Sequence, residues 1–249
     1  MLNNKMNQPL RPTQHVEHFL VTSILDGAYS AGSVLPNERT LSEQLGVTRP
    51  TLRETLQRLE NEGWLKIQHG KPTVVNDYWQ KGGLSLLSTL AKYGEYLPNG
   101  FITHLLEVRG TLLPAVARFA AEHHPDVITE HLAGARGLPN EAGSYAAFDW
   151  SLQMLMARHS NNPIFPLILN DFGSIFKSMA LRYFSQQKAR ETSCEFYRDL
   201  SRAIQNGGEV VEDTVKDAME NSIRIWKQTG FTGEADHETL EWLGQRTED

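Results

Sequence analysis

Cysteine and long apolar runs are nearly absent from this sequence. A single cysteine, Cys194, is present among 249 residues, which excludes an internal disulfide and indicates a reducing compartment. No stretch approaches the roughly 18 consecutive apolar residues that a membrane-spanning helix needs. The N-terminal residues also lack the apolar segment of a signal peptide. These absences predict a soluble, cytoplasmic protein.

Recognisable catalytic motifs are missing as well. The sequence contains no Gly-x-Ser-x-Gly turn and no cluster of histidines and cysteines with the spacing of metal ligands. Cys194 lies outside any motif typical of a nucleophile, so we interpret it as a buried or inert thiol. We therefore predict that the protein is not an enzyme. An enzyme that processes CoA thioesters is kept as a minor alternative.

The segment from Leu35 to Val75 contains a dense series of helix and turn signals. Asn37 is suited to cap a first helix, and Gly46 is suited to end it. Thr48 can cap a second helix, whose inward-facing leucines are Leu52, Leu56 and Leu59. Two capped helices joined by a tight turn predict a helix-turn-helix over about residues 38–57, of the kind whose second helix enters the major groove of DNA.

The residues that follow the second helix change to the two-residue period of β-strands. His69 and Gly70 would form the two-residue centre of a hairpin. The pattern predicts a wing over residues 65–75. Lys71 would lie near the wing tip, where it can meet a phosphate or the negative potential of a narrow minor groove.

The outer face of this region has the chemistry that DNA contacts require. A guanidinium can pair with a guanine edge or clamp a phosphate, and threonine hydroxyls and helix N-terminal amides hold phosphates. The residues that we predict to contact DNA are Arg39, Thr48, Arg49, Thr51, Arg53, His69, Gly70 and Lys71. The alternative is a solvated face in which the arginines pair with Glu38, Glu43 and Glu54.

The overall charge opposes phosphate, because the formal net charge is −6. Residues 36–75 nevertheless hold six Lys/Arg against five Asp/Glu, so the acidic excess lies elsewhere. Acidic groups elsewhere limit non-specific binding, while a few placed arginines act locally. We therefore predict a modest DNA affinity for each monomer and a dependence on dimerisation.

The rest of the chain is dominated by helical periodicity. A helix at about His15–Tyr29 precedes the helix-turn-helix, and a series of amphipathic helices follows from residue 84 to 230. We expect a mainly α protein, with a winged helix-turn-helix domain over residues 1–75 and an all-α helical bundle over residues 84–230. A linker over residues 76–83 connects them, and an acidic tail occupies residues 231–249.

The run LPNERTLSEQLGVTRPTLRETLQRLENEGWL closely resembles the GntR family of bacterial transcriptional regulators, and IQHGKPT resembles its fatty-acid-responsive FadR branch. The likeness continues more loosely to about residue 228. It implies a homodimer that binds a pseudopalindromic DNA operator and regulates fatty acid metabolism, as a repressor of fatty acid degradation and as an activator of unsaturated fatty acid synthesis. Pro50 departs from the threonine of the branch, which removes a hydroxyl contact and leaves the operator sequence open.

Many relatives in the GntR family hold a divalent metal through one aspartate and three histidines. The resemblance places Asp149 at the aspartate position, but it places Gln153, Tyr197 and Ser222 at the histidine positions. Amide, phenol and hydroxyl groups make a poor site for zinc, nickel or manganese. We therefore predict no metal and no cofactor.

The FadR branch instead implies that a long-chain fatty acyl-CoA binds the helical bundle and releases the protein from DNA. The resemblance assigns effector contacts to Leu105, Leu106, Arg109, Phe176, Tyr183, Ser222 and Trp226. Apolar side chains suit the acyl chain, and a cation suits the thioester or a phosphate. Two alternatives stay open: Arg109 pairs internally with Asp149, or departures at Gln153, Ala218 and Met219 favour a different CoA thioester or a small carboxylate.

Overall fold

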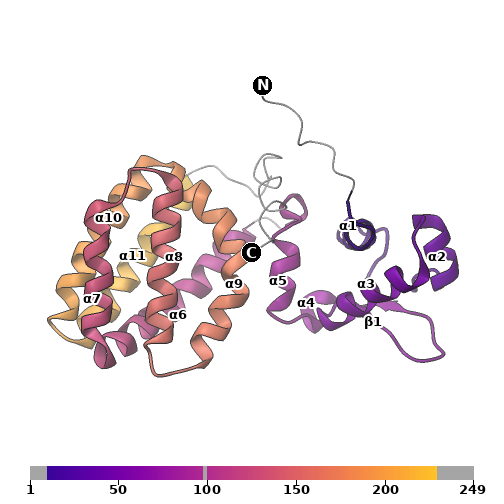
Figure 1. Cartoon of the computed structure of the whole chain (residues 1–249), viewed down its shortest axis with the longest axis horizontal. Helices are drawn as coiled ribbons and strands as arrows, with labels where there is room; N and C mark the ends of the chain where they lie inside the picture. Colours follow the sequence, from indigo (N-terminus) through magenta and orange to yellow (C-terminus); the bar gives the residue numbers. More distant parts are fainter. Residues whose placement is uncertain (1–9, 98–99, 229–249) are drawn as a thin grey trace. The chain divides into compact units, whose positions relative to one another are not determined.

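The computed structural model describes residues 10–97 and 100–228 (Figure 1). The chain divides into two compact units, Met1–Leu86 and Leu87–Asp249, and the division falls inside helix α5 (Ser85–Leu90). Helices and one two-stranded sheet make up the regular structure of the described residues, so the predicted mainly α fold is confirmed. The predicted acidic tail, residues 231–249, lies outside the described residues.

The first unit has the helices and the sheet of a winged helix-turn-helix. Its elements are α1 (Pro12–Leu25), α2 (Glu38–Leu45), α3 (Arg49–Asn61), β1 (Leu65–Lys66), β2 (Val74–Val75) and α4 (Tyr78–Lys81). The predicted caps are confirmed, because the Asn37 side chain accepts a hydrogen bond from the Thr40 amide and Thr48 accepts one from the Thr51 amide. Gly46 ends α2 in the left-handed conformation, with φ of 65°.

Two boundaries differ from the sequence-based prediction. Helix α1 begins at Pro12 and ends at Leu25, about four residues before the predicted end. Helix α3 includes the predicted inward-facing Leu59 and ends at Asn61, past the predicted helix-turn-helix span of about residues 38–57. Gly63 turns the chain after it with φ of 94°, and the Arg58 guanidinium forms an ion pair with the buried Glu17 carboxylate of α1, so the last turn of α3 also has a tertiary contact.

The wing is also built differently from the predicted two-residue hairpin. Strand β1 pairs antiparallel with β2 through Leu65 opposite Val75 and Lys66 opposite Val74, and residues 67–73 form the loop between them. The Ile67 amide donates to the Glu60 carboxylate at 2.7 Å, so it is not available to a longer ladder. Pro72 has no amide to donate. His69 and Gly70 are the two central residues of a turn, as predicted, with Gly70 at φ of 71°, but the strands do not pair directly beside them, so the predicted two-residue hairpin is a longer loop.

The predicted linker residues fold against the end of α3. The Asn76 side-chain amide donates to the carbonyls of Gly63 and Leu65 at 3.1 and 3.0 Å, and the Tyr78 ring packs on the buried Trp64 ring with centroids 4.7 Å apart. Gly63 and Gly82 are in such close contact that a Cβ on Gly63 would lie 2.6 Å from the Gly82 Cα. The segment after β2 is therefore packed onto the first unit as far as Gly82.

Substituting Gly63 should destabilise the first unit more than the same change elsewhere. Gly63 has φ of 94°, and an added Cβ would overlap backbone atoms, which cannot move as a side chain can. Gly27 has a similar φ of 85° but open space around it, so Gly27→Ala is the matched control. We expect Gly27→Ala to cost about 1–2 kcal/mol from the left-handed backbone alone. Gly63→Ala should cost more in chemical denaturation, and equal losses would contradict the close approach.

The second unit is an all-α bundle (Figure 1). Its described elements after α5 are η1 (Gly94–Tyr96), α6 (Phe101–His123), α7 (Pro125–Ala133), η2 (Gly134–Gly137), α8 (Ala142–Arg158), α9 (Ile164–Ser185), α10 (Gln187–Ile204) and α11 (Gly208–Gln228). Helix α6 packs along α11, and α8 packs along α9. Pro114 lies inside α6, which continues through it. Buried apolar side chains from α6 to α11 form the main core.

No single helix of the described residues is long and apolar enough to cross a bilayer. Two consecutive segments of α9, residues 164–177 and 179–185, together have the length and apolar composition of a membrane span, but they are inclined to each other by 55°.

Candidate functional site

The N-terminal end of α3 presents an exposed cation. Arg49 is the first residue of this helix, its side chain is exposed, and it forms no ion pair within the described residues. The Thr48 and Thr51 hydroxyls lie beside it, with their oxygens 2.9 Å apart. Hydroxyls and amides at a helix N-terminus are groups that hold phosphate. This end of α3 therefore has the groups that contact with a DNA backbone requires.

The other two predicted arginines are paired in the structure. Arg39 Nε lies 3.0 Å from Glu43 Oε1 on the same helix, and Arg53 Nε lies 2.6 Å from Glu38 Oε2. The alternative of arginines paired on a solvated face thus describes these two residues. It does not describe Arg49, and Glu54 forms no ion pair within the described residues.

The three predicted wing residues, His69, Gly70 and Lys71, are exposed in the loop between β1 and β2. Their backbone turn is closed by a hydrogen bond from the Lys71 amide to the Gln68 carbonyl at 3.0 Å. Neither His69 nor Lys71 has an ion-pair partner among the described residues. The wing thus adds an unpaired cation to the surface of the first unit.

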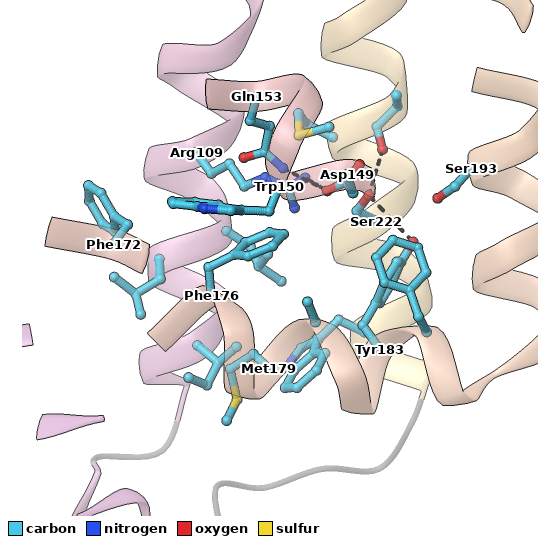
Figure 2. A pocket seen from close by; sticks show the side chains of 18 of the residues that line it. Arg109, Asp149, Trp150, Gln153, Phe172, Phe176, Met179, Tyr183, Ser193 and Ser222 are labelled. Atoms are coloured by element: carbon cyan, nitrogen blue, oxygen red, sulfur yellow. Dashed lines mark hydrogen bonds and ion pairs between the residues drawn. The ribbon is translucent and has the colours of Figure 1, made fainter. Parts of the chain in front are cut away.

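The second unit contains a cavity of about 90 Å³ (Figure 2). All the residues predicted to contact the effector line this cavity: Leu105, Leu106, Arg109, Phe176, Tyr183, Ser222 and Trp226. Sequence reasoning missed other lining residues, which include Trp150, Phe172, Ser193 and Phe196. Apolar spacing along a helix does not separate a side chain that faces a cavity from one that packs in a core. No local signal could therefore have identified them.

A buried polar cluster centred on Asp149 forms part of the cavity wall. Arg109 Nη2 lies 2.9 Å from Asp149 Oδ2, and Gln153 Nε2 donates to the same oxygen at 2.6 Å. The Tyr197 hydroxyl donates to Oδ1 at 3.2 Å. Figure 2 shows Arg109 and Gln153 converging on Asp149 beside the apolar side chains of the cavity. Arg109 therefore both lines the cavity and pairs with Asp149, so the internal ion pair is confirmed and the contact with an effector stays a prediction.

The same cluster explains how Asp149 is satisfied without a metal ligand set. Gln153 and Tyr197, at two positions where metal-binding relatives have histidine, act here as hydrogen-bond donors to Asp149. Burial raises the pKa of the Tyr197 phenol well above its ordinary value, and the nearby Asp149 charge adds to this, so the phenol keeps the proton that it donates. Within the described residues, no group of three or more His, Cys, Asp or Glu could hold a metal ion.

One donor of the cluster remains unsatisfied. Arg109 Nε is buried and has no hydrogen-bond partner in the described part of the chain. The guanidinium carbon lies 5.4 Å from the centre of the Phe176 ring, which in turn packs on Trp150 with centroids 4.8 Å apart. A buried donor without a partner costs free energy. The cavity therefore offers a hydrogen bond to an acceptor, such as a carbonyl or phosphate oxygen, that can reach it.

Met219, one of the departures from the FadR branch, lies where α6 and α11 pack together. Met219 is buried, and a Cβ placed on Gly110 of α6 would lie 3.5 Å from its Cβ. This separation is an ordinary van der Waals contact, so α6 approaches α11 closely at this point. On the cavity side, the Tyr183 hydroxyl donates to Ser222 at 3.4 Å, and burial raises the pKa of this phenol. The polar groups at the α11 wall are thus held by short-range contacts.

Comparisons with known proteins agree across both units. Residues 12–75 match the family described as bacterial regulatory proteins, gntR family, and residues 76–232 match the FadR C-terminal domain. A fatty acid metabolism regulator protein of Shewanella frigidimarina is 43% identical over 198 residues, covering 78% of this chain and 82% of that protein. One of Enterobacter sp. is 38% identical over 216 residues, covering 86% and 90%.

A solved structure supports the fold independently. The structure of Lar, described as controlling the Listeria monocytogenes agr system, has a TM-score of 0.60 at 16% identity and covers 89% of this chain and 99% of its own. At this identity the likeness concerns the fold alone. Two matched domains that together cover most of the chain, and relatives near 40% identity, decide the family. The chain therefore belongs to the GntR family of bacterial regulatory proteins, in the group that carries a FadR C-terminal domain.

Proposed function

We propose that this protein is a sequence-specific DNA-binding transcriptional regulator of fatty acid metabolism, which a long-chain fatty acyl-CoA releases from its operator. The relatives that are named fatty acid metabolism regulators support the process. We infer the chemical class of the effector from one observation: an apolar cavity has in its wall a buried guanidinium whose Nε is without a hydrogen-bond partner among the described residues. Apolar walls suit an acyl chain, and the unpaired donor suits an acceptor oxygen such as that of a thioester.

The size of the cavity suggests how binding is coupled to a change of structure. Its volume of about 90 Å³ is well below the roughly 300–1,000 Å³ of typical ligand pockets. A long acyl chain therefore enters only when lining side chains such as Phe176 and Met179 move. A ligand that requires one arrangement of these side chains shifts the protein toward it. This differential binding is what a release mechanism needs.

In this proposal, the exposed cations of the first unit bind the DNA. Arg49 and Lys71 are unpaired, and a homodimer would present two such surfaces to a pseudopalindromic operator. The protein would act in the cytoplasm, where bacterial DNA lies. Because linkage is reciprocal, an effector that weakens DNA binding is itself bound more weakly by the DNA-bound protein, by the same factor. The position of the operator relative to a promoter decides between repression and activation.

Titration with acyl-CoA tests this function directly. A duplex selected by the protein from a random library serves as the operator, and its affinity is measured by mobility shift with CoA thioesters of increasing chain length. We expect a long-chain acyl-CoA to lower the DNA affinity by roughly 5- to 150-fold, the usual range of such couplings. Free CoA and free fatty acid are the controls. Unchanged DNA affinity throughout the series would overturn the effector while leaving the DNA binding intact.

Filling the cavity should separate the two activities. Leu105 lines the cavity from α6, whereas Val108 on the same helix is 45% exposed. We expect Leu105→Trp to bind the selected duplex normally but to resist release by acyl-CoA, because the indole occupies the space of the acyl chain. Val108→Trp, which adds the same group outside the cavity, should be released like the wild type. Equal release of both variants would show that the effector binds elsewhere.

A shorter-chain CoA thioester is the second candidate effector. The small volume of the cavity favours it, as does the buried Met219 side chain in the wall. In the same titration this candidate predicts that release is strongest with short or medium chains and weakens as the chain lengthens. A maximum at long chains would exclude it.

A further inference from the structure

The arginines of the predicted DNA-binding surface fall into two classes. Arg49 is exposed without an ion pair, as is Lys71 on the wing, whereas Arg39 and Arg53 are each paired with a glutamate of α2. The Arg39–Glu43 pair lies within α2, whereas the Arg53–Glu38 pair joins α3 to α2. Half of the four cations on this surface thus carry their own counter-charge.

Both contacts leave most of the guanidinium available. In each pair the arginine donates through Nε, which lies 3.0 Å from the Glu43 carboxylate in Arg39 and 2.6 Å from the Glu38 carboxylate in Arg53. A guanidinium has five N–H donors, and the four on its terminal nitrogens remain. An arginine held through Nε can therefore present its terminal nitrogens in a fixed direction, because the planar fork rotates little once one edge is bound.

Both pairs are exposed enough to respond to DNA. The side chains of Arg39 and Glu43 are 73% and 66% exposed, and those of Arg53 and Glu38 are 67% and 38% exposed. Exposed pairs of this kind stabilise a fold little. In the proposed DNA-binding function, a phosphate that approaches either arginine also meets its glutamate. A poorly placed phosphate can bind the arginine only by breaking its ion pair. The glutamate is then an unpaired negative charge that faces the negative DNA backbone, and this repulsion disfavours the contact.

We propose that Glu38 and Glu43 are positioning residues that determine DNA specificity by acting through Arg53 and Arg39. Each glutamate orients its arginine toward DNA and cancels its charge toward phosphates in general. A correctly placed base edge or phosphate accepts hydrogen bonds from the terminal nitrogens while the arginine stays paired with its glutamate. A random duplex offers fewer acceptors in the right positions and is bound less tightly. The non-specific attraction then comes mainly from Arg49 and Lys71. This inference rests on the proposed DNA-binding function.

The test compares Glu38→Gln and Glu43→Gln with Glu54→Gln in the full chain. Glu54 is an exposed glutamate of α3 that forms no ion pair with a described residue, so its substitution changes the net charge equally without freeing an arginine. Each variant is titrated with the duplex that the wild type selects from a random library and with a scrambled duplex of equal length. Affinities are measured by fluorescence anisotropy from 50 to 200 mM salt, and thermal melts verify folding.

We expect Glu38→Gln and Glu43→Gln to bind the scrambled duplex more tightly and to lose several-fold in the ratio of selected to scrambled affinity. Each freed cation that reaches a phosphate should steepen the salt dependence of scrambled binding by about 0.9 in log K per log salt. Glu54→Gln should leave the ratio unchanged.

Three results would overturn the proposal or its basis. Ratios that stay at the wild-type value in both paired variants would remove the positioning role, even though the protein binds DNA. The same loss in Glu54→Gln would show that net charge alone is responsible. A wild type that selects no duplex would overturn the proposed function itself, and with it this inference.

Discussion

Replacing Arg49 by alanine is expected to lower the affinity for the selected duplex by about 10- to 100-fold, as loss of a direct arginine contact does. Arg49 is the unpaired arginine at the start of α3, so no neighbouring carboxylate shares its charge. A cation at a helix N-terminus is unfavourable to the helix dipole. The substitution should therefore leave the thermal stability unchanged or slightly higher while DNA binding falls.

The matched control is Arg224→Ala. Arg224 is an exposed arginine of α11 without an ion-pair partner in the described part of the chain, so its removal changes the net charge by the same amount. Mobility shifts at fixed salt should show wild-type binding for this control. If Arg49→Ala binds like Arg224→Ala, the N-terminal end of α3 does not contact DNA. Selection of a new duplex by Arg49→Ala would show in addition whether Arg49 contacts a base or only a phosphate.

Removing the Arg109 cation is expected to cause the largest loss of stability. The side chains of Arg109 and Asp149 are only 17% and 7% exposed, so Arg109→Met leaves a buried carboxylate with two neutral donors and no counter-charge. Breaking a buried pair in this way typically costs about 3–5 kcal/mol. Urea unfolding followed by circular dichroism measures the change, with the transition of the second unit as the readout.

Two further variants test the reason for this loss. Adding Asp149→Leu to Arg109→Met removes both charges, and most of the stability should return because no ion remains buried. Arg202→Met removes one partner of an exposed pair, whose side chains are 74% and 57% exposed, and should change the stability by less than about 1 kcal/mol. A loss in Arg109→Met no larger than that in Arg202→Met would mean that Asp149 is not held as a buried charge.

The first unit was predictable where the signals are local. Asn37, Gly46 and Thr48 act on their own helix ends, so the sequence around each is sufficient. The end of α3 is local as well, because Gly63 turns the chain with φ of 94° and the Trp64 amide donates to the Leu59 carbonyl at 2.9 Å. The wing loop, in contrast, depends on a glutamate of α3 that takes the Ile67 amide away from the sheet.

The cavity was predictable only through family resemblance. Arg109 meets Asp149 across 40 positions, and the same resemblance was needed to place Phe176 near either. Trp150 was missed because it follows Asp149 in a helix without a distinct apolar face and looks like ordinary core. Its indole fits because Gly173 has no side chain: a Cβ there would lie 3.1 Å from the ring. Such complementarity between two helices cannot be inferred from either one alone.

The backbone contact between Gly63 and Gly82 has a mechanical consequence. Two chain segments that touch without intervening side chains have no soft layer to compress, and Asn76 additionally clips them together through two carbonyls. A displacement of the polypeptide at Gly82 is thus passed directly to the end of α3. The Leu86 side chain also packs against Gly82, so the chain stays attached to the first unit beyond Gly83.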